Sequence, residues 1–480
     1  MNLVNRGARL VDGTSGDVVA GAHLESTVAA GATEYHGLPD GVVFARTGLT
    51  VAAVLRYLGA WSAGRPVALL DPALDPATLA ELVRRYRPAA VVGLGEGGAG
   101  ASPGDVPHGY TERRLDVLGP AWVRSTPDRV PAVHPDLGVL LATSGSTGSP
   151  KLVRLSRRAV HANATAIAEA LVIDSDEIAP TSLPLFYSYG LSVLNSHLVA
   201  GATVLVADGG VLSREFWTAF DAHGATSLAG VPYHYEMLAR IRWSPVKHPS
   251  LRMLTQAGGR LRPELIAEFH EKISSAGGRM VPMYGQTEAT ARITVLPPGR
   301  LPGKLGSPGI ALPGGRLSVV TDDGTETVVP GVTGEIVYRG PNVMMGYAED
   351  ATDLARGDDL GGVLRTGDLG YLDDEGFLFL TGRLKRIGKV FGVRVNLDDI
   401  EKLLRDSDLD LPGPVAAVPA GEKVAVWCEG DYDDAARAEL GKVLSERLKM
   451  HRSGFEVRAV ERLPLLSSGK IDYRALEARA

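Results

Sequence analysis

The sequence predicts an α/β protein with more than one domain. In roughly the first three hundred residues, short apolar runs alternate with amphipathic stretches, which is typical of strands and helices in α/β layers with largely parallel pairing. A chain of 480 residues is also too long for one ordinary hydrophobic core. The composition then changes twice, because glycine and proline recur from about residue 302 and a basic segment begins near residue 384.

The first part of the chain predicts a large N-terminal domain over residues 1–383. Apolar runs predict strands at 66–70, 89–93, 203–206 and 280–283, and amphipathic patterns predict helices at 51–60 and 76–86. Within this domain, residues 302–383 predict a small β-rich subdomain, since strands such as 334–338 are short and turn residues are frequent.

Residues 384–480 predict a compact α+β domain at the C-terminus. The helical patterns and strands that indicate it lie at 397–405, 415–418, 424–427 and 434–448.

Composition and charge exclude several classes of function. The hydrophobic content of 45%, the charged content of 22% and the net charge of -6 are typical of a soluble globular protein. Because the arginines are dispersed, we expect no nucleic-acid partner. The single cysteine, Cys428, excludes an intrachain disulfide and a multi-cysteine metal site. The chain shows neither an apolar signal-peptide core nor a membrane-spanning run, so we expect a cytoplasmic protein without a membrane partner.

A loop rich in hydroxyls and glycine follows the apolar run at 139–142. It consists of Thr143, Ser144, Gly145, Ser146, Thr147, Gly148, Ser149, Pro150 and Lys151. Glycine lets backbone N–H groups approach an anion closely, the hydroxyls add donors, and the lysine adds a mobile positive charge. The loop is therefore suited to a polyphosphate, although the proline before the lysine distinguishes it from a Walker A loop. A flexible surface turn is the alternative.

Five further segments follow this loop along the chain. They are Ala257–Arg260, Tyr284–Glu288, Arg365–Asp368, the basic stretch from Gly382 through Lys389 to Glu401, and Ser467–Asp472. Together with the loop, these segments resemble the core motifs of the adenylate-forming superfamily. This superfamily contains acyl-CoA synthetases, the adenylation domains of nonribosomal peptide synthetases and beetle luciferases. The resemblance runs from about residue 51 to residue 480, and six motifs in the family's order are specific where each alone is weak.

The resemblance implies an enzyme that activates a carboxylic acid with ATP and Mg²⁺. The carboxylate attacks the α-phosphate of ATP, and an acyl-adenylate and pyrophosphate are formed. Because negative charge builds on the phosphoryl oxygens, catalysis depends on positioning and on electrostatic stabilisation.

The resemblance also assigns roles to individual residues. The loop would hold the β- and γ-phosphates, and Thr147 and Glu288 would bind Mg²⁺, which prefers oxygen ligands. Asp368 would accept hydrogen bonds from the ribose hydroxyls, and Arg383 would donate to the ribose or a phosphate. Lys470 would bridge the substrate carboxylate and the α-phosphate. The residues expected around the adenine and the rest of the nucleotide are Gly258, Gly259, Tyr284, Gly285, Gln286 and Thr287.

Several of these residues have a purely structural alternative. Glu288 could be the N-terminal carboxylate of a helix that Thr287 caps. Arg365 and Asp368 could form a surface ion pair of small energetic value. Lys470 could be an ordinary solvated lysine.

In the family, the small C-terminal domain rotates between two half-reactions, so we expect residues 384–480 to be mobile. Lys385 falls at the hinge position, where backbone torsions absorb the movement. Lys470 would face the site during adenylation, and the face that carries Lys389 and Gly392 would do so during acyl transfer. For Lys385 a plain basic surface segment is the alternative.

The pocket for the acid is less clearly marked. Residues 184–190 resemble the family's aromatic gate segment, and residues 230–235 are expected to form another wall. The residues expected to line the pocket are Tyr187, Tyr189, Gly190, Val231, Tyr233 and His234. No aspartate is present in the gate segment to pair with an α-ammonium group, which disfavours α-amino acids. Tyrosine and histidine side chains could bind a polar or aromatic acid, or they could serve only in packing.

The expected acceptor of the acyl group is a thiol, either of CoA or of a carrier protein's phosphopantetheine. Since the sequence ends at Ala480, soon after Lys470, we expect any carrier to be a separate protein. An amine or other nitrogen nucleophile, a luciferase-like oxidase and a non-catalytic adenylate-binding relative are the alternatives.

Overall fold

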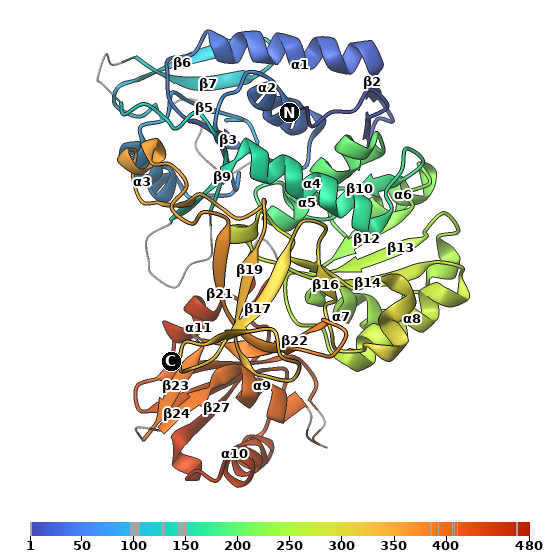
Figure 1. Cartoon of the computed structure of the whole chain (residues 1–480), viewed down its shortest axis with the longest axis vertical. Coiled ribbons are helices and arrows are strands. Elements are labelled where there is room, and N and C mark those ends of the chain that lie inside the picture. Colours follow the sequence, from blue (N-terminus) through green and yellow to red (C-terminus); the bar gives the residue numbers. More distant parts are fainter. Residues whose placement is uncertain are drawn as a thin grey trace. The chain divides into compact units, whose positions relative to one another are not determined.

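The computed structural model (Figure 1) describes residues 2–96, 106–125, 130–142, 151–384, 386–391, 393–405, 407, 409, 411–466 and 469–480. The chain divides into two compact units. The first unit comprises residues 1–316 and 338–364, and the second comprises residues 317–337 and 365–480. The predicted α/β fold class is confirmed by the order of helices and strands. The boundary at residue 383 and the mobility of residues 384–480 stay predictions.

The largest sheet of the first unit has eight strands. In order across the sheet they are β20 (Gly346–Ala348), β9 (Leu152–Ser156), β8 (Leu137–Ala142), β4 (Val67–Leu70), β3 (Val43–Arg46), β5 (Ala90–Val92), β7 (Gly119–Arg124) and β6 (Tyr110–Leu115). The central pairs β8–β4, β4–β3 and β3–β5 are parallel, and the outer pairs are antiparallel. In this sheet the predicted parallel pairing therefore holds only at the centre. At one edge the short connection between β6 and β7 makes an antiparallel hairpin, and at the other β20 comes from a distant part of the chain.

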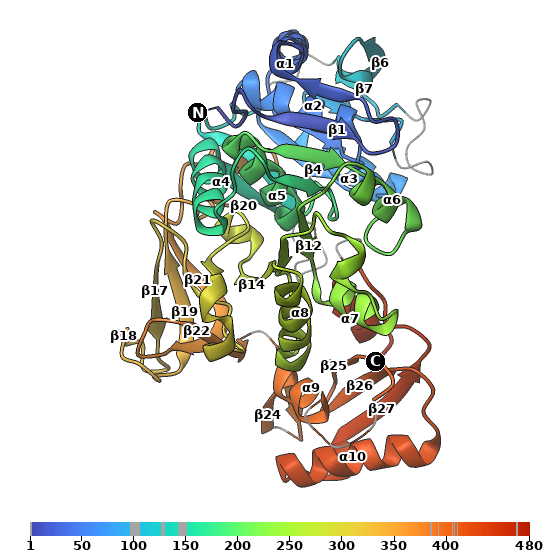
Figure 2. The same ribbon diagram turned by 90° about the vertical axis from the view of Figure 1, so that its right-hand side faces the viewer.

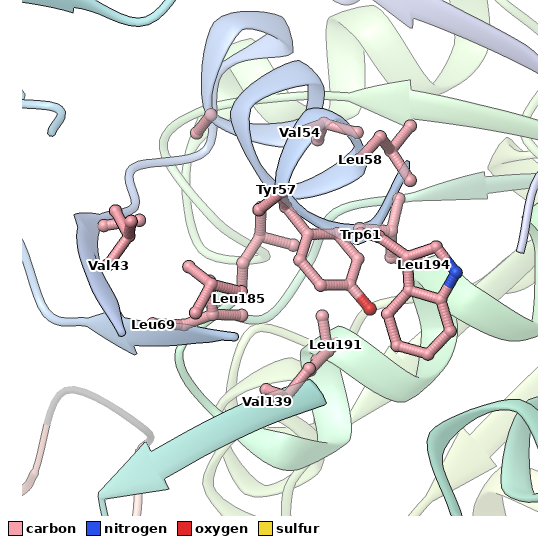
Figure 3. Close-up of a cluster of buried hydrophobic side chains, with 14 of the residues drawn as sticks. Val43, Val54, Tyr57, Leu58, Trp61, Leu69, Val139, Leu185, Leu191 and Leu194 are labelled. Carbon is pink, nitrogen blue, oxygen red and sulfur yellow. The ribbon is translucent and has the colours of Figure 1, made fainter. Parts of the chain in front are cut away.

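Residues on the two faces of this sheet pack against different helices. Val43 and Leu69 face α2 (Val51–Ser62) and α5 (Ser188–Ala200), where Figure 3 shows Tyr57 and Trp61 beside Leu191 and Leu194. The neighbouring strand residues face the other side and pack against α3 (Pro76–Tyr86). This alternation follows from the two-residue period of a strand, and it gives the unit two hydrophobic layers.

Two smaller sheets complete the first unit. One has the order β10 (Ile178–Pro180), β11 (Thr203–Val206), β1 (Arg9–Asp12) and β2 (Val18–Ala20). The other has the order β12 (Ser227–Gly230), β13 (Met253–Gln256), β14 (Arg279–Tyr284), β15 (Thr294–Val295) and β16 (Ile310–Ala311). Strands β12, β13 and β14 are parallel, so their carboxyl ends meet at one edge.

The remaining helical elements of the first unit connect these strands. The α-helices are α1 (Gly21–His36), α4 (Arg157–Leu171), α6 (Arg214–Ala222), α7 (Pro232–Arg240) and α8 (Pro263–Ser275). The 3-10 turns are η1 (Pro245–Lys247), η2 (Thr287–Ala289), η3 (Pro298–Gly303) and η4 (Thr352–Ala355). Side-chain caps fix several helix starts: Asp75 accepts from the Thr78 backbone N–H at 2.9 Å and Ser156 from that of Ala159 at 3.0 Å.

The second unit contains most of a five-stranded sheet, a hairpin and a three-stranded sheet (Figure 2). The five-stranded sheet has the order β18 (Glu326–Thr327), β17 (Arg316–Val320), β19 (Gly334–Arg339), β21 (Val363–Leu372) and β22 (Leu378–Arg383). The hairpin pairs β23 (Ile387–Val390) with β24 (Val393–Asn396). The three-stranded sheet has the order β25 (Val415–Ala420), β26 (Lys423–Glu429) and β27 (Phe455–Val460).

Helices cover both faces of the three-stranded sheet. One face packs against α9 (Leu397–Arg405) and α10 (Asp434–Leu448), and the other packs against α11 (Tyr473–Glu477). A short turn, η5 (Arg452–Gly454), precedes β27. The helices predicted at 397–405 and 434–448 therefore have the predicted bounds.

Across the described residues, none of the helices combines the length and the apolar character that crossing a bilayer requires.

The tight packing of the core between α2, α5 and the large sheet predicts that removing a buried side chain there destabilises the fold. Leu194 is 1% exposed within this core, so Leu194→Ala should lower the free energy of unfolding by about 2–5 kcal/mol. Leu212 is 49% exposed, and Leu212→Ala is the matched control, with an expected change within about 0.5 kcal/mol. Urea unfolding followed by tryptophan fluorescence measures both. Equal effects of the two variants would contradict the packing.

Candidate active site

Three parallel strands deliver the predicted nucleotide-binding segments to one edge of the first unit. Val231 follows β12, the pair Gly258 and Gly259 comes just after β13, and Tyr284 ends β14. Ligands of α/β proteins bind at the carboxyl ends of parallel strands, where loops leave the sheet side by side. The edge formed by these three strands, here called the β12–β14 edge, therefore collects two of the predicted motifs and one wall of the predicted acyl pocket.

Tyr187 lies against the backbone of the glycine pair. It precedes α5, and a Cβ placed on Gly258 would lie 2.4 Å from the Tyr187 hydroxyl oxygen and 3.1 Å from Val231 Cγ1. Gly258 also has a φ of +83°, which side chains other than glycine rarely adopt. The gate segment and the glycine pair, which are far apart in the sequence, are thus in contact.

Gln256 braces the glycine turn and was missed by the sequence analysis. Its Nε2 donates to the Gly259 carbonyl oxygen at 2.9 Å and to that of Ala257 at 3.3 Å. Gln256 is 3% exposed and is the last residue of β13, so its buried amide stabilises the turn that follows the strand. Nothing in the sequence distinguishes this glutamine from any other at the end of a strand.

The segment from Tyr284 to Glu288 leads from β14 into η2, and all five residues are half-buried. Thr287 is the first residue of η2, and its hydroxyl lies 3.1 Å from that of Ser188 on α5. Glu288 therefore does lie in the first turn of a short helix, as the structural alternative has it, but Gln286 and not Thr287 is at the cap position. The contact of Thr287 with Ser188 ties the segment to the gate.

Strand β20 supports two of the predicted nucleotide-binding residues, which the sequence analysis did not foresee. The Tyr347 hydroxyl donates to Glu288 Oε1 at 2.7 Å. Two residues further on, Glu349 Oε1 lies 2.6 Å from Lys151 Nζ. Tyr347 lies on β20 and Glu349 in the bend that directly follows it, so this short segment contacts both Glu288 and Lys151. The pairing of β20 with β9 is a long-range contact and leaves no signal in the local sequence.

Among the residues predicted for the acyl pocket, Tyr189 and Val231 are buried in one hydrophobic cluster, and Tyr187 and Tyr233 pack against it. The Tyr189 hydroxyl lies 2.9 Å from Thr255 Oγ1 and 3.1 Å from the Thr255 carbonyl oxygen. The tyrosines of the gate meet edge to face, with ring centroids 6.3 Å apart. The structure thus brings the two predicted walls together.

The other two predicted pocket residues have local constraints. A Cβ on Gly190 would lie 2.2 Å from the Pro184 carbonyl oxygen. Because glycine has no Cβ, the first turn of α5 can pack closely against the loop that precedes the helix. His234 is half-buried on α7, and its Nδ1 has no hydrogen-bond partner among the described residues. Burial lowers the pKa of His234 to about 4, so the imidazole is neutral near neutral pH.

Arg292 is a buried cation that the sequence analysis missed. It is 2% exposed, and its guanidinium carbon lies 4.1 Å from the centroid of the Tyr189 ring. Its Nη2 donates to Ser192 Oγ at 3.1 Å. A signal was present, because this arginine interrupts the otherwise uncharged segment 289–296 directly after the motif that ends at Glu288.

In the second unit, the predicted ribose ligands lie side by side. Asp368 of β21 pairs with Arg383 of β22, and Arg383 Nε lies 3.2 Å from Asp368 Oδ1. Arg365 does not pair with Asp368, since it donates from Nε to Glu335 Oε2 at 2.7 Å. The alternative of an Arg365–Asp368 ion pair is therefore wrong, because an odd spacing along a strand directs side chains to opposite faces.

Lys470 of the second unit lies in a tight turn. Its carbonyl oxygen accepts from the Leu466 backbone N–H at 2.8 Å, and the side chain is half-buried. Of Lys389 the structure describes the backbone, which pairs with Arg394 across the β23–β24 hairpin. The predicted residues that lie outside the described residues are Thr143, Ser144, Gly145, Ser146, Thr147, Gly148, Lys385 and Gly392.

Arg386, next to the predicted hinge residue, is a further residue that the sequence analysis missed. Its guanidinium pairs with Asp398 at 2.6 Å and with Glu401 at 2.7 Å, and it lies 3.9 Å from the centroid of the Tyr473 ring. The basic motif is thus anchored to α9 and α11 within the second unit.

The oxygen donors of the first unit fit a magnesium ion that arrives with a nucleotide. Among the described residues, no group of three or more histidine, cysteine, aspartate and glutamate side chains could hold a metal ion by itself. Mg²⁺ in nucleotide sites is usually held by one or two carboxylates together with phosphate oxygens. Glu288, half-buried and oriented by Tyr347, supplies one such carboxylate.

These features define the class of the protein as an AMP-forming acid–thiol ligase that works through an acyl-adenylate. The sequence profile of the family described as AMP-binding enzyme matches residues 39–348. The chain belongs to this family and so to the adenylate-forming superfamily, and the membership predicted from the sequence motifs is confirmed.

Individual relatives agree with this assignment. The chain is 35% identical to indoleacetate–CoA ligase of Aromatoleum aromaticum over 367 residues, which cover 73% of this chain and 69% of the relative. It is 30% identical to the salicyl-AMP ligase / salicyl-S-ArCP synthetase of Mycobacterium tuberculosis over 347 residues, covering 70% and 60%. In fold it is similar to ATP-bound MatB from Rhodopseudomonas palustris, with a TM-score of 0.77, 24% identity, and coverage of 100% and 99%.

The contact between Gly258 and Tyr187 predicts that a methyl group added at position 258 lowers activity, whereas one added at a glycine without such a contact does not. Gly258→Ala and Gly277→Ala both place alanine at a φ near +80°, at a cost of about 1–2 kcal/mol each. Only Gly258→Ala also forces a methyl group against Tyr187, since nothing lies within 4 Å at Gly277. We expect a loss of acid-dependent ATP turnover of about tenfold or more in Gly258→Ala and none in Gly277→Ala. Equal turnover in both variants would contradict a role for this contact.

The environment of His234 predicts a pH dependence of stability. Its pKa is about 4 in the folded chain and 6.5 as an ordinary value, so the unfolded chain binds more protons between these values. The free energy of unfolding should therefore fall as the pH falls from about 6.5 towards 4, by on the order of 2 kcal/mol from this group at about pH 5. His234→Gln should reduce that slope in urea titrations. An unchanged slope would show that folding does not lower the pKa of His234.

Proposed function

We propose that adenylation of the acid takes place at the β12–β14 edge, and that the acyl group is then transferred to the thiol of CoA. The observation that supports this proposal is the convergence at this edge of the glycine pair, the Tyr284–Glu288 segment and the gate tyrosine Tyr187. The two motifs and the gate are separated by many residues in the sequence, and the fold brings them into one place.

We propose the following roles in the first unit. The bare backbone at Gly258 and Gly259 and the Tyr284 ring flank the adenine. Glu288 holds the magnesium ion, which neutralises phosphate charge when it is bound. Lys151 exchanges its half-exposed partner Glu349 for the β- and γ-phosphates, which costs little because an exposed ion pair contributes about 0–1 kcal/mol.

In the second unit, Asp368 accepts hydrogen bonds from both ribose hydroxyls, and Arg383 donates to the ribose or to a phosphate. Lys470 neutralises charge between the substrate carboxylate and the α-phosphate as the carboxylate attacks. A positive charge in that position stabilises the transition state more than the ground state, which is the condition for a faster reaction.

CoA is the proposed acceptor because a relative that is 35% identical is named a CoA ligase. A carrier-protein phosphopantetheine is the second candidate, since a relative that is 30% identical is named as a synthetase of an acylated carrier protein. We further propose a cytoplasmic location, where ATP and reduced thiols are available.

Exchange of labelled pyrophosphate into ATP, run across aryl, short-chain, fatty and amino acids, tests the adenylation step. Lys470→Ala should lower the exchange rate with the preferred acid by about a hundredfold or more, because it removes the charge at the α-phosphate. Lys402→Ala, which changes an exposed lysine of the same unit, is the matched control and should exchange at the wild-type rate. Exchange in Lys470→Ala at the rate of the control would overturn the proposed role.

A further inference from the structure

Three arginine side chains of the described residues are fully buried, and the Nε atoms of two of them, Arg46 and Arg292, have no hydrogen-bond partner there. Arg154 pairs with Asp359 at 2.5 Å and also donates to the carbonyl oxygens of Met345 and Gly357. Arg46 donates to the carbonyl oxygens of Leu94 and Pro72. Arg292 is the third, and it lies at the β12–β14 edge.

Within the described part of the chain, no carboxylate contacts the Arg292 guanidinium. Its contacts are the Ser192 hydroxyl, at 3.1 Å, and the face of the Tyr189 ring. Its Nε is buried without a hydrogen-bond partner. Burial lowers the pKa of Arg292 and the neighbouring phenols oppose that shift, but an arginine stays protonated in a protein. A buried cation with an unused donor is costly unless an anion joins it.

The backbone holds Arg292 in this costly position. The two residues before it, Thr290 and Ala291, have φ values of +61° and +132°, which are rare for residues other than glycine. Asn342 then fixes the turn, since its Nδ2 donates to the Arg292 carbonyl oxygen at 2.9 Å and to that of Ala289 at 2.8 Å. Strain of this kind persists at functional sites, where a side chain is required in one place.

Arg292 lines a narrow cavity among α4, α5 and strands β12–β14. Methionines of β13 and β14 give it apolar surface, and its polar lining comprises Arg292, His197, Ser196, Ser227 and Thr255. His197 Nδ1 lies 2.8 Å from the Val193 carbonyl oxygen, so this nitrogen carries the proton and the unpartnered Nε2 offers only a lone pair. The positive charge in this cavity therefore comes from Arg292. Arg292 also contacts the ring of Tyr189, one of the residues predicted to line the acyl pocket.

We propose that Arg292 binds a second carboxylate of the substrate, and that the enzyme activates dicarboxylic acids in preference to the matching monocarboxylic acids. The inference rests on the proposed function, because it names the substrate class of that same site. One carboxylate of the acid attacks ATP near Tyr187, and the other reaches the Arg292 guanidinium, whose Nε and fork of N–H groups suit a carboxylate. A monocarboxylic acid would leave the buried cation unpaired, which selects against it.

Pyrophosphate exchange with matched pairs of acids tests this specificity. The pairs are succinic with butyric acid, glutaric with valeric acid, and terephthalic with benzoic acid. For the wild type we expect kcat/KM to be about a hundredfold higher, or more, for the better diacid than for its monoacid partner. Arg292→Met should reverse that preference, Arg292→Lys should keep part of it, and Arg214→Met, an exposed control on α6, should leave it unchanged.

The outcomes separate the two proposals. Exchange with monoacids at rates equal to those of the diacids, or an unchanged preference in a folded Arg292→Met, would overturn the role of Arg292 and leave the adenylation function intact. Exchange with no acid at all would overturn the proposed function and this inference with it. Thermal unfolding and the KM for ATP report whether Arg292→Met is folded. If Arg292→Met does not fold, the role of Arg292 is judged from the preference of the wild type for diacids and from its partial retention in Arg292→Lys.

Discussion

The parallel register of β12, β13 and β14 is the constraint on which the rest of the active site depends. Gly230 pairs with Gln256, and Gln256 pairs with Pro282, so β12 and β13 end level and β14 continues two residues further, to Tyr284. Each strand is followed at once by a segment that the family uses for its substrates. A slip of one residue in any of these strands would turn its side chains to the opposite face and displace the loop that follows.

Two physical features make the β12–β14 edge suitable for binding: the close approach of a side chain to the glycine backbone, and charged groups held by fixed partners. Glycine at position 258 lets the Tyr187 hydroxyl contact the backbone, where any side chain would intervene. Strand β20 brings Tyr347 to Glu288, and the bend that follows it brings Glu349 to Lys151, so both groups are oriented before a nucleotide arrives. Orientation in advance reduces the entropy that binding and reaction must otherwise lose.

Much of the fold could be predicted from local patterns. The amphipathic stretches at 76–86, 397–405 and 434–448 match α3, α9 and α10, since capping residues such as Asp75 and Asp433 mark helix starts in the sequence itself. The sequence analysis overestimated the parallel pairing, because an apolar pattern does not distinguish parallel from antiparallel strands. The edge strand β6 pairs with its neighbour in the chain, β7, and the edge strand β20 pairs with the distant β9.

The candidate site could be predicted only where its residues form motifs. The glycine pair and the Tyr284–Glu288 segment are recognisable runs, whereas Tyr347 and Arg292 act through partners distant in the sequence. Gln256 acts on the nearby backbone, but only its burial at the end of β13 shows this. A buried arginine cannot be distinguished from an exposed one until the packing around it is known.

The central claim is that the protein activates an acid as its adenylate, and identifying the nucleotide products of ATP cleavage tests it most directly. The purified protein would be incubated with ATP, magnesium, a preferred acid and CoA, and the nucleotide products would be separated by chromatography. We predict AMP and pyrophosphate, formed only when the acid is present, and an acyl-adenylate that can be isolated when CoA is omitted. Formation of ADP and phosphate, or ATP cleavage that does not depend on the acid, would contradict the account.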